Sequence, residues 1–414
     1  MPVSFDPAAA REFAVDVVAT LRAAGQQALW AGGCVRDQLL GRTPKDYDVA
    51  TDAPPERVRE IYGKRRTLPL GAAFGVITVL GPKSAGQIEV ATFRRDLGYS
   101  DGRRPDAVAY STAEEDAQRR DFTINGLFFD PLANEVIDYV GGREDLAAGV
   151  IRAIGVPAER FAEDKLRMLR AVRFTAAFDF VLDAATAEAI RAAASELTVV
   201  SPERIAAELR RMLEHPRRAL AAELLAVTEL LPEILPESRT LDAAAWSRTK
   251  LVLDRFEACD FATALAALVR EMRTVSAGDF AALLAERWRL ANDERDGVAW
   301  LLEQEALIRS AREVPWPRLQ RVLAAPRCDE LLQYADAVGD VAAAEYCRER
   351  IAGPCETWDP PPLLTGNDLI RAGFRPGPRF RTVLDEVRDA QLDGVVTSPA
   401  EALGLARTLF QAGS

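Results

Sequence analysis

Histidine is almost absent from this chain, because His215 is the only one among 414 residues. A Ser-His-Asp or Cys-His catalytic group would have to run through that single residue, and a metal site made of several histidines is excluded. Any catalytic metal ion must therefore be held by carboxylates.

Cysteines are few, and long apolar runs are missing. The cysteines are scattered, without a Cys-x-x-Cys pair, which argues against a disulfide framework and a zinc site and predicts reduced thiols; they are Cys34, Cys259, Cys328, Cys347 and Cys355. No apolar run approaches the roughly 18 to 20 residues of a membrane span. Residues 1–29 lack the basic segment and apolar core of a signal peptide. We therefore expect a soluble, cytoplasmic protein with no membrane partner.

Positive charge is also in deficit, since the formal net charge is −11. Such a balance by itself disfavours an RNA partner, because phosphate binding needs Lys and Arg. The local clustering of the arginines therefore matters more than their number.

Patterns of secondary structure change along the chain, whose length predicts two to four domains. The first part mixes the two kinds of element: apolar spacing predicts helices over 7–24 and 35–40, and strands over 28–31, 46–50, 75–80 and 87–93. From Glu144 to about Arg350, Ala, Leu, Glu and Arg at 3.6-residue spacing predict helices only. Consecutive prolines in 358–363 predict a stiff linker before a small C-terminal unit.

Two motifs suited to phosphate and metal chemistry lie within residues 31–51. Gly32 and Gly33 let backbone N–H groups approach an anion at the start of a helix, and Arg36 adds a fixed cation for a phosphate. A bare Gly-Gly pair is more often only a turn.

The second motif is Asp46-Tyr47-Asp48. On a strand, Asp46 and Asp48 share one face and can bridge a pair of hard cations, while Tyr47 points the other way. In two-metal transfer, one ion activates an attacking 3′-hydroxyl and the other neutralises leaving pyrophosphate, so no histidine is needed. An isolated Asp-x-Asp is more often a strand end or a turn, so this interpretation depends on the motifs around it.

The order of these motifs resembles a known family. Gly-Gly-x-x-Arg-Asp, Leu-Leu-Gly and Asp-x-Asp are similar to the head-domain signature of class II tRNA nucleotidyltransferases and bacterial poly(A) polymerases. The segments 88–94, 98–105, 114–125 and 161–173 resemble the family's next motifs, in the family's order. The resemblance is strong over about 28–215, fades through the helical middle and returns weakly at the C-terminus.

The resemblance implies a fold and a division into domains. The fold is an α+β nucleotidyltransferase head, similar to that of polymerase β, followed by an all-α neck, body and tail. The head would span 1–142 and carry catalysis, the neck 143–215 and read the nucleobase, the body 216–357 and bind RNA, and the tail 358–414 and bind the tRNA elbow. Four tail arginines near a turn rich in Gly and Pro are either phosphate ligands or merely solvated: Arg371, Arg375, Arg379 and Arg381.

By the same resemblance, Asp46 and Asp48 would hold two Mg²⁺ ions, with Mn²⁺ as an alternative, and would be catalytic. Asp121 would be a further catalytic carboxylate, although Glu89 is the other candidate and a structural role stays open for both. The nucleotide would be bound by Gly32, Gly33, Arg36, Arg120, Asn125, Asp164, Arg167, Arg170 and Arg173.

Asp164 and Arg167 would replace the template strand. Asp164 only accepts hydrogen bonds and Arg167 only donates them, and we expect the two as i and i+3 neighbours on one helix. Cytosine N4 or adenine N6 would donate to Asp164, and cytosine N3/O2 or adenine N1 would accept from Arg167. Arg170 and Arg173 turn progressively away from Asp164, so we assign them to phosphate contact or to orienting the first two.

The expected activity is template-independent addition of CMP and AMP, from CTP and ATP, to the tRNA 3′ end by a CCA-adding or an A-adding enzyme. The Gly-rich, charged segment 98–105 predicts a mobile loop. In the family, such a loop helps the switch to adenosine addition, and its presence argues against a CC-only enzyme.

A bacterial poly(A) polymerase is the first alternative, because 114–125 and 161–173 also resemble that branch, but the tail weighs against it. A non-catalytic RNA-binding relative is the second, and the intact pair of aspartates disfavours it. A fused His-Asp phosphohydrolase is excluded by the single histidine. The oligomeric state stays open.

Overall fold

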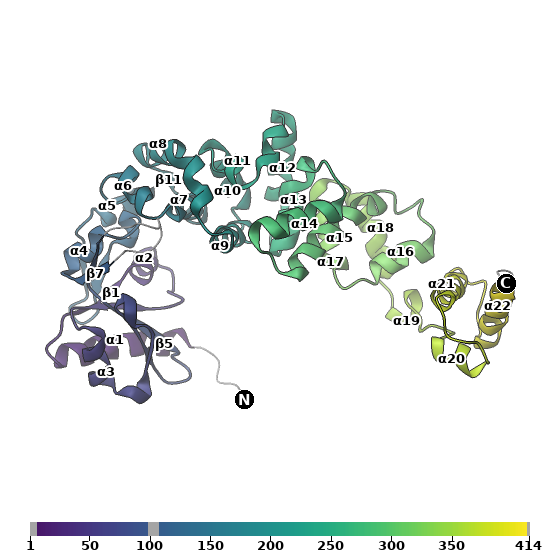
Figure 1. Ribbon diagram of the computed structural model, residues 1–414, viewed down its shortest axis with the longest axis horizontal. Coiled ribbons are helices and arrows are strands. Elements are labelled where there is room, and N and C mark those ends of the chain that lie inside the picture. The colour runs from purple at the N-terminus through teal and green to yellow at the C-terminus, as the bar shows by residue number, and fades with distance from the viewer. Residues whose placement is uncertain (1–5, 98–106, 412–414) are drawn as a thin grey trace. The chain divides into compact units, whose positions relative to one another are not determined.

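The computed structural model describes residues 6–97 and 107–411. The chain divides into two compact units, Met1–Arg239 and Thr240–Ser414, and each is described by itself (Figure 1). The predicted loop at 98–105 lies outside the described residues.

A seven-stranded mixed sheet forms the N-terminal part of the first unit, in the order β3-β4-β5-β2-β1-β8-β9. β2 and β5 are parallel, and the other neighbours in this sheet are antiparallel. Its strands are β1 Ala28–Ala31, β2 Asp48–Thr51, β3 Thr67–Gly71, β4 Val76–Leu80, β5 Gln87–Thr92, β8 Phe128–Asp130 and β9 Glu135–Ile137. A separate two-stranded sheet pairs β6 Arg94–Leu97 with β7 Ala107–Tyr110 in antiparallel orientation.

Helices make up most of the rest of this unit. They are α1 Pro7–Ala23, α2 Gly33–Leu39, α3 Pro55–Tyr62, α4 Ala113–Gln118, α5 Gly142–Ala148, α6 Pro157–Glu163, α7 Leu166–Phe178, α8 Ala184–Ala193, α9 Pro202–Leu213, α10 Arg218–Val227 and α11 Leu231–Ile234. Short 3₁₀ turns are η1 Lys64–Arg66, η2 Ala72–Phe74, η3 Thr123–Asn125, η4 Ala194–Val199 and η5 Pro236–Thr240.

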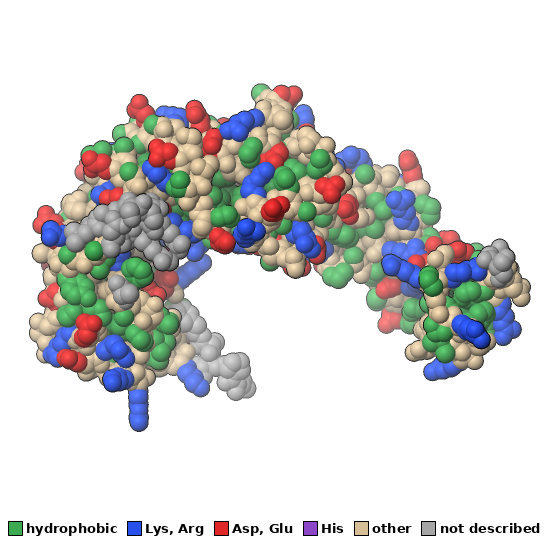
Figure 2. Space-filling view, in the orientation of Figure 1, with side chains coloured by type: hydrophobic (Ala, Val, Ile, Leu, Met, Phe, Trp, Pro, Cys, Tyr) green, Lys and Arg blue, Asp and Glu red, His purple; other side chains and the backbone are tan. Residues whose placement is uncertain are grey.

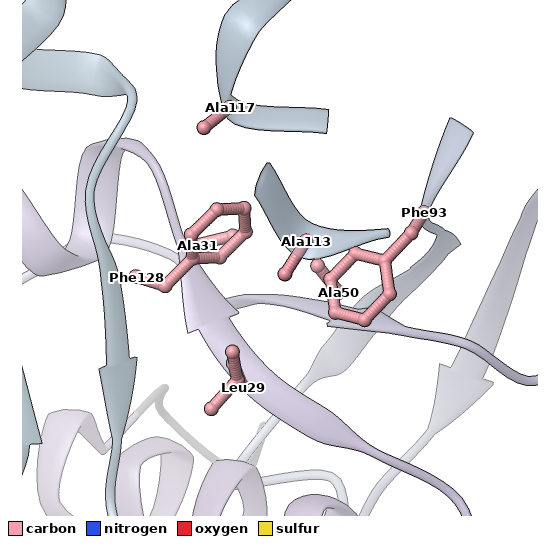
Figure 3. Packing of buried hydrophobic residues seen from close by; sticks show 7 residues of the cluster. All are labelled: Leu29, Ala31, Ala50, Phe93, Ala113, Ala117 and Phe128. Atoms are coloured by element: carbon pink, nitrogen blue, oxygen red, sulfur yellow. The ribbon is translucent and has the colours of Figure 1, made fainter. Parts of the chain in front are cut away.

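Both faces of the sheet are covered, and β1, which lies between β2 and β8, is therefore buried along its whole length. Successive side chains alternate across a strand. Trp30 faces α1, where its indole N–H donates to Ala14 O at 3.2 Å. Leu29 faces the opposite way, into a cluster with Phe93 and Phe128 to which α4 adds two alanines (Figure 3). Burying each of these large side chains stabilises the fold by roughly 1.5–3 kcal/mol.

The predicted elements of this unit are mostly confirmed. The helix over 7–24 is α1, the strands over 28–31, 75–80 and 87–93 are β1, β4 and β5 within a residue, and the predicted helix at 35–40 begins earlier, at Gly33. The prediction of helices alone from Glu144 onward is wrong at one place. β10 Val150–Ile151 and β11 Val181–Leu182 form a parallel pair, and strands of two residues are too short to show an alternating pattern.

The second unit is helical throughout its described residues, as expected. Its elements are η6 Arg270–Met272, α12 Ala243–Arg255, α13 Phe261–Val269, α14 Ala277–Trp288, α15 Asn292–Arg309, α16 Trp316–Leu323, α17 Cys328–Val338, α18 Val341–Ile351, α19 Cys355–Trp358, α20 Gly366–Arg371, α21 Arg379–Leu392 and α22 Pro399–Gln411. Every residue of α13 is buried, because α12, α15 and α17 pack around it.

The last three helices have an apolar core of their own, built on Leu369, Val383 and Ala402 among others. The proline-rich segment before them carries no helix or strand between Trp358 and Gly366, as the predicted linker requires. Arg388 of α21 donates to Asp359 Oδ1 at 2.7 Å at the start of this segment. The five cysteines are free thiols, and no described helix is both long and apolar enough to cross a membrane.

Candidate active site

A cavity of about 930 Å³ opens in the first unit and is lined by residues from the start of β2, from α2, and from α7 and α9. All twelve residues that the sequence assigns to the site line it: Gly32, Gly33, Arg36, Asp46, Asp48, Arg120, Asp121, Asn125, Asp164, Arg167, Arg170 and Arg173. Eight further residues line the same space: Asp37, Lys45, Arg119, Phe174, Ala177, Phe178, Arg211 and His215. The fold therefore brings all the predicted side chains to one place.

Asp46 and Asp48 share the cavity but not a strand. β2 begins at Asp48, which lies opposite Glu89 of β5 in the parallel ladder, so the predicted strand over 46–50 starts two residues too early. The predicted alternation is nevertheless present, since Asp46 and Asp48 are exposed and Tyr47 is only 4% exposed. The Tyr47 ring packs 4.8 Å from that of Trp30, which fixes the direction of its two neighbours.

Negative charge is concentrated around Asp48. Although its surface opens to the cavity, protein surrounds it, and this burial raises the pKa of Asp48 to about 6. The charges of Asp46 and then Glu89 act in the same direction, and Arg120 acts against them. Carboxylates with so little positive charge near them are stabilised by a hard divalent cation.

The residues present fit such a cation, with Asp46 and Asp48 as its ligands. Mg²⁺ is commonly held by one or two carboxylates, and its other ligands are water and substrate phosphates. Across residues 6–97 and 107–411, no group of three or more His, Cys, Asp or Glu side chains is arranged to hold a metal ion. Metal binding here would therefore depend on both the aspartate pair and the nucleotide.

Gly32 is required both by the backbone and by Arg120. Its φ of 72° with ψ of −123° is a conformation that L side chains rarely adopt. An added Cβ would lie 2.7 Å from Arg120 Nη1, and Arg120 is itself held by Asp116, whose Oδ2 accepts from Nη2 at 3.0 Å. At Gly33, by contrast, an added Cβ would meet only Arg36 Nη2 at 3.7 Å, an ordinary contact. The packing of the fold therefore does not require a glycine at position 33, and the missing Cβ leaves open space at the cavity.

Arg36 is bound tightly to the protein. It is 8% exposed, its Nη1 donates to Asn125 Oδ1 at 2.6 Å, and its Nε and Nη2 donate to Asp37 Oδ1 at 2.9 and 2.7 Å. The guanidinium also lies 4.5 Å from the ring centre of Phe178 in α7, a cation–π contact. Arg36 therefore joins α2 to η3 and α7 while it lines the cavity.

Asp121 is buried, and both of its oxygens have donors within the protein. Oδ2 accepts from Arg170 Nε and Nη2 at 2.8 and 2.5 Å, and Oδ1 accepts from the Asn125 amide at 3.0 Å and from Phe122 N–H at 2.8 Å. Burial acts to raise the pKa of Asp121, but Arg170 and the Asn125 hydrogen bond lower it to about 2. With all of its roughly four lone-pair positions in use, Asp121 is better placed to hold Arg170 than to bind a metal ion.

Asp164 and Arg167 do not lie on one helix, contrary to the prediction. α6 ends at Glu163, Asp164 has φ of −148° and ψ of 104°, and α7 begins at Leu166. The break has a local cause, because Asp164 Oδ1 accepts the Leu166 N–H at 3.0 Å and so satisfies a donor at the start of α7. Both side chains still line the cavity, so an acceptor and a donor face the same space.

Arg167 is held by three groups. Nη1 donates to Glu163 Oε2 at 2.5 Å and to Arg160 O at 3.1 Å, and Nη2 donates to Arg119 O at 2.9 Å. Of the five N–H donors of a guanidinium, three are thus used within the described part of the chain. Two remain for a ligand.

Positive charge dominates further along α7. Arg173 Nε lies 2.8 Å from Glu208 Oε2 of α9, and Glu208, which is 2% exposed, also pairs with Arg211 at 3.1 Å. Burial lowers the pKa of Arg173 to about 10, and Arg170 and Arg211 add to this against the opposing effect of Glu208. An anionic ligand would be attracted to this end of the cavity.

The residues that α9 contributes to this region were not predicted from the sequence. Arg204, Glu208 and Arg211 are four and three residues apart and so share one helix face, and Arg204 binds both oxygens of Asp164. Glu208 could have indicated that α9 contacts charged residues of the site, because a carboxylate among apolar residues on a helix needs a cationic partner. Phe178 and His215 belong to no pattern that distinguishes them from core or surface residues.

Two family models match this chain. One is described as "Poly A polymerase head domain" and matches residues 28–152, and the other is described as "Probable RNA and SrmB- binding site of polymerase A" and matches residues 179–241. The first match includes the sheet and the aspartates Asp46, Asp48 and Asp121.

Proteins that are similar to this chain over more than nine tenths of its length include several CCA-adding enzymes. The chain is 32% identical over 402 residues to that of Lactobacillus helveticus, covering 94% of this chain and 95% of the relative. It is similar to the crystal structure of the Bacillus stearothermophilus CCA-adding enzyme in complex with CTP, with a TM-score of 0.79, 29% identity and 98% of each chain covered. The Thermotoga maritima CCA-adding enzyme complexed with tRNA shares the fold, with a TM-score of 0.69, 20% identity and coverage of 96% and 95%.

Proposed function

This chain belongs to the family of CCA-adding enzymes, which are tRNA nucleotidyltransferases, and we propose that it builds the complete 3′-CCA end of tRNA from CTP and ATP without a template. The observation that carries the proposal is that one cavity is lined both by Asp46 and Asp48 and by the groups that we assign to the phosphates and to the base. The head model also refers to poly(A) polymerases, but the likeness to CCA-adding enzymes extends over 94% of the chain and includes the tail, which favours tRNA.

Enzymes of this family use divalent metal ions, and we propose two Mg²⁺ ions with Asp46 and Asp48 as their ligands; Mn²⁺ suits the same oxygens. Such ions, when bound, activate the RNA 3′-hydroxyl and neutralise charge on the leaving pyrophosphate. The raised pKa of Asp48 supports this assignment, since burial and the charges of Asp46 and Glu89 outweigh the effect of Arg120.

The transfer forms a bond from the RNA 3′-oxygen to the α-phosphorus of the nucleotide and breaks the bond from that phosphorus to the β-phosphate. We assign the triphosphate to Gly32, Gly33, Arg36 and Arg120, where Gly33 has no Cβ to obstruct its approach. Asn125 binds the side chains of Arg36 and Asp121 and accepts from Arg120 through its carbonyl, so it aligns this group.

Base selection is assigned to Asp164 and Arg167. Asp164 would accept the exocyclic amino group of cytosine or adenine, and the two remaining donors of Arg167 would reach cytosine N3/O2 or adenine N1. Uracil and guanine place a carbonyl oxygen opposite Asp164 and are rejected. Arg170 supports this region through Asp121, and Arg173 adds positive charge for the phosphates.

The resemblance also assigns roles to larger segments. The head at 1–142 would catalyse transfer, the neck at 143–215 would read the base, the body at 216–357 would bind RNA, and the tail at 358–414 would bind the tRNA elbow. Lys and Arg side chains are spread over the visible face of the tail (Figure 2). Because the proposed substrate is tRNA, we also propose that the protein acts in the cytoplasm.

The test uses purified protein with tRNAs that end before CCA, after C and after CC, and with an unrelated RNA. Each RNA is incubated with CTP, ATP or both, and products are sized on a gel. Extension of all three tRNAs to CCA is expected. Growth of only the CC-ending tRNA would indicate an A-adding enzyme, long tails on every RNA a poly(A) polymerase, and no growth a non-catalytic relative.

A further inference from the structure

Two phenylalanines of α7 hold arginine side chains along one side of the cavity. Phe174 and Phe178 are four residues apart on the helix, and their rings stack with their centres 5.9 Å apart. The guanidinium carbons of Arg173 and Arg170 lie 4.2 and 5.2 Å from the centre of the Phe174 ring. That of Arg36 lies 5.3 Å from the centre of Phe174 and 4.5 Å from the centre of Phe178. Three of the arginines assigned to the nucleotide are therefore neighbours on two stacked rings.

Arg42 is a fourth arginine on these rings, and it is not among the predicted site residues. Its guanidinium carbon lies 5.0 Å from the centre of the Phe178 ring, which also carries Arg36. Phe178 lines the cavity, whereas Arg42 is not among the described residues that line it. Arg36 is 8% exposed and Arg42 is exposed. The step from Arg36 to Arg42 across one ring therefore leads from inside the cavity to its outer side.

The charge of Arg42 is not neutralised by an acidic side chain. Among the described residues, no carboxylate forms an ion pair with Arg42. Asp37 binds Arg36 at 2.7 Å instead. Asp179, the residue after Phe178, binds Arg217 at 2.6 Å. An aromatic ring holds a cation without cancelling its charge, so Arg42 is available to an anion.

Two further side chains that can bind an anion stand at this end of the cavity. Arg211 in the last turn of α9 and His215 just beyond that helix both line the cavity. Burial lowers the pKa of His215, and the charges of Arg218 and then Arg42 act in the same direction, which places Arg42 close to this imidazole. His215 Nδ1 accepts from Arg217 N–H at 3.1 Å. The proton of the neutral imidazole is therefore on Nε2, which can donate to an anion.

We propose that Arg42, together with Arg211 and His215, forms an outer anion site that receives pyrophosphate after nucleotidyl transfer and guides it out of the cavity. The inference rests on the proposed function, because that function makes pyrophosphate the product and assigns the triphosphate to Arg36. Before transfer, the β- and γ-phosphates are bonded to a nucleotide that is held by its base. After transfer that bond is broken, and Arg42 is the next cation outward from Arg36.

The same site serves the reverse reaction, in which pyrophosphate enters. An oxygen of pyrophosphate then bonds to the α-phosphorus of the terminal adenylate, the bond from that phosphorus to the RNA 3′-oxygen breaks, and ATP leaves. Closely spaced cations attract a multiply charged anion and raise its rate of association. Loss of Arg42 should therefore weaken the use of free pyrophosphate more than the binding of ATP, which also has its base to hold it.

The test compares R42M and R42K with the wild-type enzyme in both directions. Addition of AMP to tRNA ending in CC gives KM for ATP, and formation of ATP from pyrophosphate and tRNA ending in CCA gives KM for pyrophosphate. For R42M we expect KM for pyrophosphate to rise by about three- to tenfold and KM for ATP by no more than about twofold. R42K keeps the charge, so its constants should lie near those of wild type.

A matched control removes a similar arginine elsewhere in the same unit. Arg66 is exposed and lies 5.8 Å from the centre of the Tyr62 ring, but it is not among the described residues that line the cavity. R66M should leave both constants unchanged. Methionine at position 42 can still pack on Phe178, and if R42M does not fold by circular dichroism, R42Q provides the same comparison.

Three results would overturn the inference. Unchanged KM for pyrophosphate in R42M, with melting temperatures lowered equally in R42M and R42K, would show that Arg42 only joins its loop to α7. An equal rise in KM for ATP would place Arg42 in the triphosphate site itself, and a rise in KM for tRNA alone would show that an RNA phosphate occupies this site. If the proposed function fails, the wild-type enzyme itself adds no nucleotide and releases no pyrophosphate.

Discussion

The charge state of Asp48 depends on three neighbours and on how far water reaches it. A cation bound to Asp46 and Asp48 competes with the proton for the same oxygens, so metal binding lowers the pKa of Asp48 and a lower pH weakens metal binding. A carboxyl whose pKa lies at about 6 in the folded protein therefore makes the metal requirement sensitive to mildly acidic conditions.

We expect the Mg²⁺ concentration for half-maximal activity to rise as the pH falls through about 6, toward tenfold for each pH unit below it. Above that pH, Asp48 is already ionised and the requirement should level off. Nucleotide incorporation measured over Mg²⁺ titrations between about pH 5 and pH 8 checks this. A requirement that does not change with pH would contradict a metal-binding role for Asp48.

Replacing Asp48 by Asn should abolish incorporation, by about a thousandfold or more, because the carboxylate pair is lost. Binding of tRNA should change by no more than about twofold, since phosphate contacts carry that affinity. Mg²⁺ should also raise the melting temperature of wild type more than that of D48N. Persistent incorporation by D48N, or by the matching Asp46→Asn, would rule out the assigned metal ligands.

The two adjacent glycines should respond differently to alanine. G32A forces a side chain into a positive-φ conformation against Arg120 and should lower the free energy of unfolding by about 1–3 kcal/mol. G33A has room for its methyl group in the fold and should leave stability nearly unchanged while raising KM for CTP and ATP. Urea unfolding and steady-state kinetics of both variants provide the comparison. Equal loss of stability would show that Gly33 is also a structural glycine.

At the scale of helices and strands, the region to which we assign base selection consists of the break between α6 and α7 and the pair of helices α7 and α9. The α6–α7 break directs Asp164 into the cavity, and the contact between α7 and α9 joins Arg173 to the buried Glu208. Removing one member of a buried ion pair leaves the other charge without a partner, which costs more than the pair itself contributes. The packing of α7 on α9 should therefore depend on Glu208.

We expect Glu208→Leu to lower the free energy of unfolding by about 3–5 kcal/mol, since Arg173 and Arg211 would then repel each other without a carboxylate between them. The double variant E208L/R173L should regain part of that loss. Denaturant unfolding of both proteins measures the difference. If the double variant is less stable than E208L, the ion pair is not what joins the two helices here.

At the scale of the whole molecule, catalysis and recognition of tRNA are assigned to different units. The tail has an apolar core of its own, and its arginines divide into two kinds. Arg379 donates to Leu409 O and Phe410 O near the end of α22 and therefore has a structural task. Arg371, Arg375 and Arg381 are exposed and are the better candidates for phosphate contacts.

The triple variant R371A/R375A/R381A should raise KM for full-length tRNA by about tenfold, with a smaller salt dependence, because phosphate contacts are removed. KM for a minihelix that lacks the elbow should not change. The matched variant R371K/R375K/R381K keeps the charges and should bind tRNA nearly as well as wild type. An equal loss on both substrates would show that the tail does not contact the elbow.

Much of the site followed from local sequence. Gly32, Asp46 and Asp48 all lie within residues 32–48, and together with the motifs around them they suggest phosphate and metal chemistry, whereas each pattern alone is more often only a turn. Apolar periodicity was enough to place α1, β1, β4 and β5. The start of β2 was predicted wrongly because a strand begins where its partner allows pairing, and Glu89 of β5 lies outside any window around Asp46.

The sequence by itself determined the composition that leaves carboxylates as the only metal ligands, the order of the motifs and the helical nature of the second half. Only the tertiary structure decided which charges belong together: Asp121 with Arg170, and Asp164 with Arg204. The partners in each pair are distant along the chain, so the local spacing of residues does not predict which charges pair. Their pairing depends on how η3, α7 and α9 pack against one another. That packing fixes the directions in which Asp164 can accept and Arg167 can donate hydrogen bonds.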